Sequence, residues 1–107
     1  MDTAIIRELF ENYIAACEQI GKGEYADRCK AVLGKLPPFK IGKYGQLQEW
    51  YRDYEEADVH HRHVSHLYGL YPAAMIREEE LKEACRVTLK RRGKDGTGWC
   101  IAWKAAL

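Results

Sequence analysis

Apolar residues recur at three- and four-residue steps over residues 3–20, and this spacing predicts an amphipathic α-helix that ends near Gly21. The stripe consists of Ile6, Leu9, Phe10, Tyr13, Cys17 and Ile20. Residues 24–36 show the same spacing until Pro37 stops it. Because the connection between the two segments is short, they are expected to form an antiparallel helical hairpin.

Two more helices are expected in the second half of the chain, over residues 77–92 and 99–107. The first begins with glutamates and ends with the basic run 90–92, which suits the helix dipole. The last is apolar on most sides, and such a helix requires burial. We therefore expect an all-α chain built of helical hairpins, and we interpret residues 1–107 as a single partial domain of a larger fold.

A long irregular loop region is predicted in the middle of the chain, at about residues 37–75, because glycines interrupt the apolar periodicity there. Residues 39–42 favour a short extended segment, and residues 46–54 favour one or two helical turns. Long loops inside compact chains are usually functional or disordered. The aromatic content of this region argues against disorder.

The composition excludes several classes of protein. The chain has 107 residues and a net charge of +1, so a nucleic-acid binder with its basic excess is not expected. The four cysteines show no Cys-x-x-Cys spacing, and we expect them to be reduced and mostly buried. No signal peptide and no membrane-spanning run is evident, so no membrane partner is expected and the chain as given is predicted to be cytoplasmic.

All four histidines lie within seven residues, at His60, His61, His63 and His66. Histidine serves proton transfer, sugar recognition and metal binding near neutral pH. His63 and His66 are three residues apart and could share a metal, although no His-Glu-x-x-His spacing occurs. The cluster could instead bind a sugar, or its side chains could hold the loop together through hydrogen bonds.

Carboxylates and a glycine-rich turn form two further candidate sets. Glu49 lies between Leu47 and Trp50 and is a candidate for partial burial, whereas the acidic run 53–56 is interpreted as solvated surface. The turn 95–99 precedes a helix start whose free N–H groups could bind oxygen atoms. It has neither phosphate-loop nor nucleophile-elbow spacing.

Three motifs together resemble glycoside hydrolase family 95, which contains α-L-fucosidases and related α-L-galactosidases. They are Ile41-Gly-Lys-Tyr-Gly-Gln-Leu-Gln-Glu-Trp50, His61-Arg-His-Val-Ser-His-Leu-Tyr-Gly-Leu-Tyr-Pro72, and Arg92-Gly-Lys-Asp-Gly-Thr-Gly-Trp99 with Ala102-Trp103-Lys104. The resemblance covers residues 30–107, and the order and separation of the motifs also match. Ala73 and Cys100 depart from the family, which usually has glycine and serine at these positions.

The resemblance implies that the chain is one part of an (α/α)6 toroid, near the C-terminal end of the barrel. Family members hydrolyse terminal α-L-fucosyl or α-L-galactosyl linkages with inversion. The resemblance places their general acid and water-activating residues outside this chain, which is therefore expected to be inactive alone. No cofactor and no metal are implied.

The resemblance also implies a set of sugar-binding residues. It assigns His61 and His63 to the sugar pocket most directly, and Thr97 and Trp99 after them. Gln46, Glu49 and Trp50 match a family motif whose role is less defined. The expected partners are an oligosaccharide or glycan substrate and the remainder of the barrel, or a second copy through self-association. A non-catalytic helical carbohydrate-binding or assembly module and, more weakly, a metal-binding regulatory protein stay open as alternatives.

Overall fold

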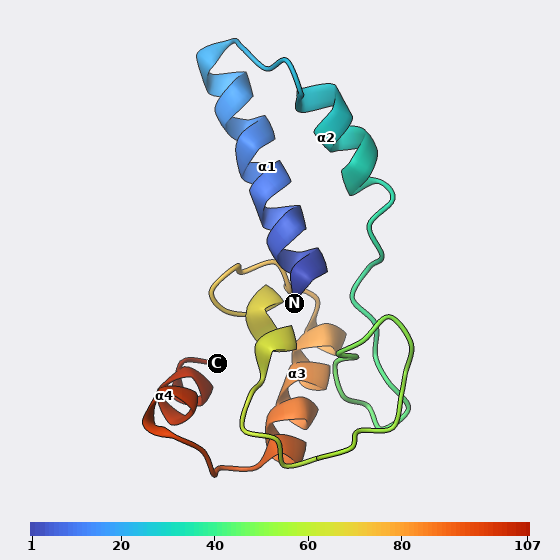
Figure 1. The fold of residues 1–107 in the computed structure, drawn as a ribbon, viewed down its shortest axis with the longest axis vertical. Helices are drawn as coiled ribbons and strands as arrows, with labels where there is room; N and C mark the ends of the chain where they lie inside the picture. Colours follow the sequence, from blue (N-terminus) through green and yellow to red (C-terminus); the bar gives the residue numbers. More distant parts are fainter. The chain divides into compact units, whose positions relative to one another are not determined.

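The computed structural model describes residues 1–107, and its regular elements are helical (Figure 1). They are α1 (Asp2–Ile20), α2 (Ala26–Leu33), the short 3-10 helix η1 (Ser65–Gly69), α3 (Glu79–Arg92) and α4 (Gly98–Ala106). The only β-type pairing is an isolated antiparallel bridge between Ile41 and Leu47. The prediction of an all-α chain is confirmed. None of the helices is long and apolar enough to span a membrane.

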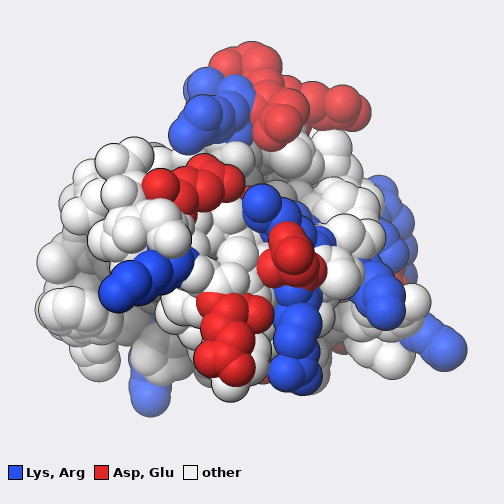
Figure 2. Space-filling view, turned by 90° about the horizontal axis from the view of Figure 1, so that it is seen from above, with Lys and Arg blue, Asp and Glu red and all other residues white.

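The contacts divide the chain into two units, and each is described by itself. One consists of residues 2–38 and the other of residues 39–107 together with Met1. Charged side chains of both signs occur on the face drawn in Figure 2.

The first unit is a hairpin in which α1 contacts α2. Ala4 and Cys17 are its buried side chains. Gly23 is required in the connection, because a Cβ atom there would lie 2.7 Å from Cys17 Cβ. The Arg7 guanidinium donates to the carbonyls of Leu36 and Pro37, each at 3.4 Å, and so ties the segment after α2 back to α1.

Helix α2 is shorter than the predicted range 24–36. Its C-terminal end tightens into bonds between residues three apart, from Lys35 N to Val32 O and from Leu36 N to Leu33 O. A proline disfavours helical backbone at the residue before it, and Pro37 directly follows Leu36. The apolar spacing therefore continues for several residues beyond the last α-helical turn.

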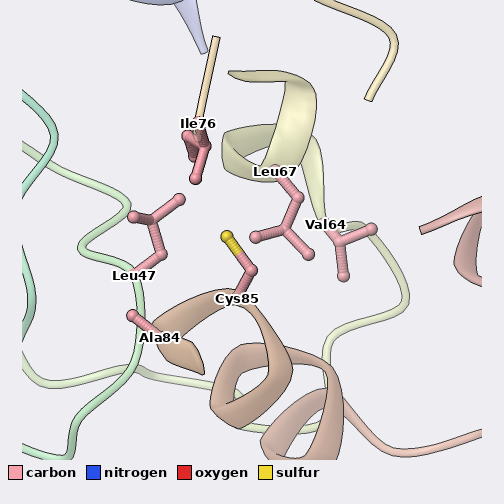
Figure 3. Packing of buried hydrophobic residues seen from close by; sticks show 6 residues of the cluster. All are labelled: Leu47, Val64, Leu67, Ile76, Ala84 and Cys85. Atoms are coloured by element: carbon pink, nitrogen blue, oxygen red, sulfur yellow. The ribbon is translucent and has the colours of Figure 1, made fainter. Parts of the chain in front are cut away.

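The core of the second unit forms where the irregular segment and η1 meet α3 (Figure 3). It consists of Leu47, Val64, Leu67, Ile76, Ala84 and Cys85. The thiol of Cys85 points from α3 toward the side chains of Leu47, Leu67 and Ile76. Tight packing continues behind Gly69, where a Cβ atom would lie 2.5 Å from Phe39 Cζ.

The prediction of helical turns at residues 46–54 is wrong. The N–H of Leu47 donates instead to Ala84 O at 3.1 Å and to Thr88 Oγ1 at 3.0 Å, both on α3. The N–H of Gln48 donates to Lys40 O at 2.8 Å. Because these backbone groups pair with α3 and with the extended segment near Ile41, none of these bonds is a helical one.

Candidate functional site

The histidine motif and the glycine-rich turn meet at one sulfur atom. His63 Nδ1 lies 3.9 Å from Cys100 Sγ, and Thr97 Oγ1 lies 3.4 Å from the same sulfur. Cys100 itself is buried at the start of α4. Its hydrogen bond with Thr97 is the main cause that lowers the pKa of the Cys100 thiol. Two motifs that are far apart in the sequence, carrying His63 and Thr97, therefore lie next to each other.

The imidazoles of His61 and His63 form a tilted pair, with ring centroids 5.3 Å apart and an interplanar angle of 50°. Arg62 Nε donates to His63 Nε2 at 3.2 Å. A neutral His63 must then carry its proton on Nδ1, which faces the Cys100 sulfur. Both histidines are solvent-exposed. They can therefore offer hydrogen-bonding groups to a polar ligand such as a sugar hydroxyl.

An open apolar groove of about 490 Å³ adjoins this pair of motifs. Its lining is Tyr68, Tyr71, Pro72, Trp99, Ala102, Trp103 and Ala106. The groove is held in shape by Trp103 Nε1, which donates to Tyr71 O at 3.2 Å. Trp99 is 78% exposed, so one of its ring faces is available to a ligand. Its position between Thr97 and Cys100 in the chain joins the groove to the polar groups.

Lys104 fixes the glycine-rich turn from the other side. Its Nζ donates to Gly93 O at 2.9 Å and to Asp95 O at 3.0 Å. The turn is thus bonded to α4 twice, from Thr97 to Cys100 and from Gly93 and Asp95 to Lys104. These bonds hold the turn against the first residues of α4, which begins at Gly98.

The structure places Gln46 and Trp50 in different settings. Gln46 is buried, its Oε1 accepts from Tyr44 N at 3.0 Å, and its Nε2 donates to Asp53 Oδ1 at 3.3 Å. Gln46 thus connects Tyr44 with Asp53 across this loop. Trp50 is 64% exposed, with its carbonyl accepting from Gln48 Nε2 at 2.7 Å. The predicted roles of Gln46 and Trp50 in sugar binding stay predictions.

Glu49 is half-buried, which confirms the expected partial burial, and its carboxylate pairs with Arg92 at 2.6 Å. His66 Nδ1 lies 3.9 Å from the same carboxylate. Burial, reinforced by the positive charge of Arg92, lowers the pKa of His66 to about 3, so this histidine is neutral at physiological pH. Its ring is buried in the protein, unlike those of His61 and His63.

The metal interpretation of the histidine cluster receives no support. His63 faces Cys100, whereas His66 faces Glu49. No group of three or more His, Cys, Asp and Glu side chains is arranged to hold a metal ion.

Sequence reasoning missed the ion-pair network around Glu56 and Arg92. Glu56 lies in an acidic run that predicts solvated surface, yet its side chain is only 16% exposed and pairs with both Arg91 and Arg92. The basic run 90–92 suits the helix dipole and predicts exposed cations, yet the Arg92 side chain is only 4% exposed. No local pattern distinguishes these residues, because burial depends on how residues 49–59 fold over α3.

Comparison with known proteins settles the family. The whole chain, residues 1–107, matches the family described as "Glycosyl hydrolase family 95 catalytic domain". The chain belongs to glycosyl hydrolase family 95. It is 47% identical over 112 residues to "Alpha-L-fucosidase 2" of Arabidopsis thaliana, an alignment that covers 100% of this chain and 13% of that protein.

Two fungal relatives agree with this membership. "Probable alpha-fucosidase A" of Aspergillus niger is 31% identical, with 95% of this chain and 14% of the relative covered. The protein of the same description from Aspergillus oryzae is 29% identical, with 95% and 16% covered. This family 95 chain therefore spans about a seventh of the length of the relatives it matches.

Proposed function

We propose that this chain forms part of the sugar-binding wall of a family 95 catalytic domain that hydrolyses terminal α-L-fucosyl or α-L-galactosyl linkages. The observation that carries the proposal is the convergence of His63, Thr97 and Cys100 beside an aromatic groove. Polar groups next to exposed aromatic faces suit a sugar, whose ring offers both hydroxyl groups and a C–H face.

In this proposal His61 and His63 hydrogen-bond sugar hydroxyls while Trp99 covers a C–H face of the ring. Thr97 and the N–H groups at the start of α4 hold further oxygen atoms. Residues 1–107 act as one segment of one helical barrel. The rest of the barrel provides the general acid and the groups that activate water, because inverting hydrolysis requires both.

The proposal is tested by L-fucose binding and by hydrolysis of nitrophenyl α-L-fucoside. We expect the chain to bind L-fucose, with His61→Ala and His63→Ala each weakening binding about tenfold. His60→Ala is the matched control, since it removes an exposed histidine from the same run and is expected to leave binding unchanged. Hydrolysis is expected only when the chain is joined by the rest of a family 95 domain.

Two results would count against the proposal. Unchanged binding in His61→Ala and His63→Ala would remove these residues from the site. Binding of L-fucose that never becomes hydrolysis, even with the rest of the domain present, would favour a non-catalytic carbohydrate-binding module.

A further inference from the structure

The guanidinium of Arg92 connects α3 to the segment that leads into the histidine motif. Its Nη2 lies 2.6 Å from Glu49 Oε2 and 3.2 Å from Glu56 Oε1. Its Nη1 donates to Asp58 O at 2.9 Å and reaches Val59 O at 3.5 Å. One buried side chain thus binds two carboxylates and two main-chain carbonyls, all contributed by residues 49–59.

Glu56 is shared between two arginines. Its Oε2 accepts from Arg91 Nη2 at 2.6 Å and from Arg91 Nε at 3.2 Å, while Oε1 faces Arg92. The Arg91 guanidinium also lies 4.3 Å from the ring centre of Tyr44. Short charge-assisted bonds of this kind fix geometry as well as adding energy. Arg91 and Arg92 therefore hold residues 49–59 through side-chain carboxylates and main-chain carbonyls, and we call this set of bonds the clamp.

The clamp continues directly into the histidine motif. Asp58 O, which accepts from Arg92, also accepts from His61 N at 3.2 Å, and Asp58 Oδ1 accepts from His60 N at 3.0 Å. The turn that begins the motif is thus built on a carbonyl that Arg92 holds. His61 Nδ1 in turn accepts from His63 N at 3.3 Å, so the position of His63 follows from that of His61.

Arg92 also lies next to the glycine-rich turn that carries Thr97. The residue after it, Gly93, begins the glycine-rich turn, and Gly93 O accepts from Lys104 of α4 at 2.9 Å. Arg92 therefore bonds to the turn that begins the histidine motif and lies at the start of the turn that carries Thr97.

We propose that Arg92 is the positioning residue of the sugar site, which orients His61 and His63 by clamping Glu49, Glu56 and the Asp58 carbonyl to α3. This inference rests on the proposed function for its ligand. Arg92 itself is buried and does not touch the sugar. It acts by holding the main-chain path from which the two imidazoles extend, so its loss changes their geometry even in a folded chain.

The test uses Arg92→Lys, which keeps the positive charge but cannot form several bonds in a planar fork. Arg86→Lys is the matched control, because Arg86 lies on the same helix and binds Glu79 and Glu83 at 3.1 and 3.0 Å on the exposed surface. Thermal unfolding first establishes a temperature at which both variants are folded. At that temperature we measure the Kd for L-fucose and the imidazole signals of His61 and His63 in two-dimensional NMR spectra.

We expect Arg92→Lys to raise the Kd about ten- to a hundredfold, the usual effect of losing a group that orients binding residues. The His61 and His63 signals should shift or broaden, and Arg86→Lys should change neither quantity. A folded Arg92→Lys chain with unchanged Kd and unchanged imidazole signals would overturn the proposal. A loss of thermal stability without these local changes would likewise assign Arg92 a purely structural role.

A second variant keeps the proposal testable if Arg92→Lys does not fold. Glu56→Gln removes one carboxylate of the clamp and leaves Arg92 in place, and we expect the same two changes at smaller size. An unchanged Kd and unchanged signals in Glu56→Gln would count against the clamp. If the unaltered chain does not bind L-fucose at all, the proposed function fails, whereas the imidazole signals still decide whether Arg92 positions His61 and His63.

Discussion

Leu67→Ala is the substitution expected to damage the second unit most. Leu67 lies in η1 with 0% of its surface exposed, and its side chain points into the cluster between Val64 and Cys85 (Figure 3). Removing a buried leucine side chain beyond Cβ costs about 2–5 kcal/mol, with larger costs where the surroundings cannot close over the cavity.

The structure indicates that the cost of Leu67→Ala lies toward the upper end of that range. The backbone of Leu67 is fixed by hydrogen bonds from its N–H to Val64 O at 2.8 Å and from Leu70 N and Tyr71 N to its carbonyl at 2.9 and 3.1 Å. A fixed backbone cannot move into the cavity, so we expect a loss of about 3–5 kcal/mol. Complete native domains have a total stability of only about 5–15 kcal/mol. The substitution should therefore remove a large part of it.

Urea unfolding followed by tryptophan fluorescence measures this loss, because all three tryptophans lie in the second unit. Leu70→Ala is the matched control. Leu70 is a half-buried leucine that directly follows η1, and its truncation should cost clearly less. A loss below about 1 kcal/mol for Leu67→Ala, or one equal to that of Leu70→Ala, would refute this account of the core.

Three further predictions follow from close packing and from buried titratable groups. Gly69→Ala should lower the free energy of unfolding, measured with urea, by about 1–3 kcal/mol, because the new Cβ would lie 2.5 Å from the Phe39 ring. Gly98→Ala is the control and should not lower it, because a Cβ at Gly98 would meet open space. His66, whose pKa is lowered from 6.5 to about 3, binds its proton more weakly in the folded chain, so stability should fall by up to about 1.4 kcal/mol per pH unit as the pH drops from 6.5 toward 3. His66→Gln should flatten this part of a stability–pH curve, and an unchanged curve would contradict the buried neutral imidazole. Burial raises the pKa of the Cys85 thiol to about 11, so its alkylation by iodoacetamide at pH 8, followed by mass spectrometry, should be at least about a hundredfold slower in the folded chain than in urea.

The helices were predictable because apolar spacing and helix-stop signals are local properties. Residues 3–20 and 77–92 differ from α1 and α3 by one or two residues at their ends. The end of α2 could not be read from spacing, since Leu36 keeps the apolar pattern after the last helical turn. The turns expected at residues 46–54 failed for a different reason. The N–H of Leu47 bonds to residues of α3 about forty positions away, and no local pattern reveals such a partner.

In the candidate site too, residue types were predictable from the sequence, whereas contacts between distant segments were not. The motifs singled out His63 and Thr97 by residue type, but only the structure shows that both face the Cys100 sulfur. Glu49 was expected to be partly buried, whereas its pairing with Arg92 depends on how two distant segments pack. Charge runs in particular hide such roles, because an arginine at the end of a helix has the same sequence signature whether it is solvated or buried.

The most direct test of the sugar-site proposal is an NMR titration of the isotopically labelled chain with L-fucose, with D-glucose as the control sugar. The account predicts saturable shifts at His61, His63 and Trp99, which come from the two motifs that meet at Cys100. It would be contradicted by the absence of any saturable shift up to about 10 mM L-fucose, ten times the upper end of usual Michaelis constants. Saturable shifts that leave all three residues unmoved would contradict it equally.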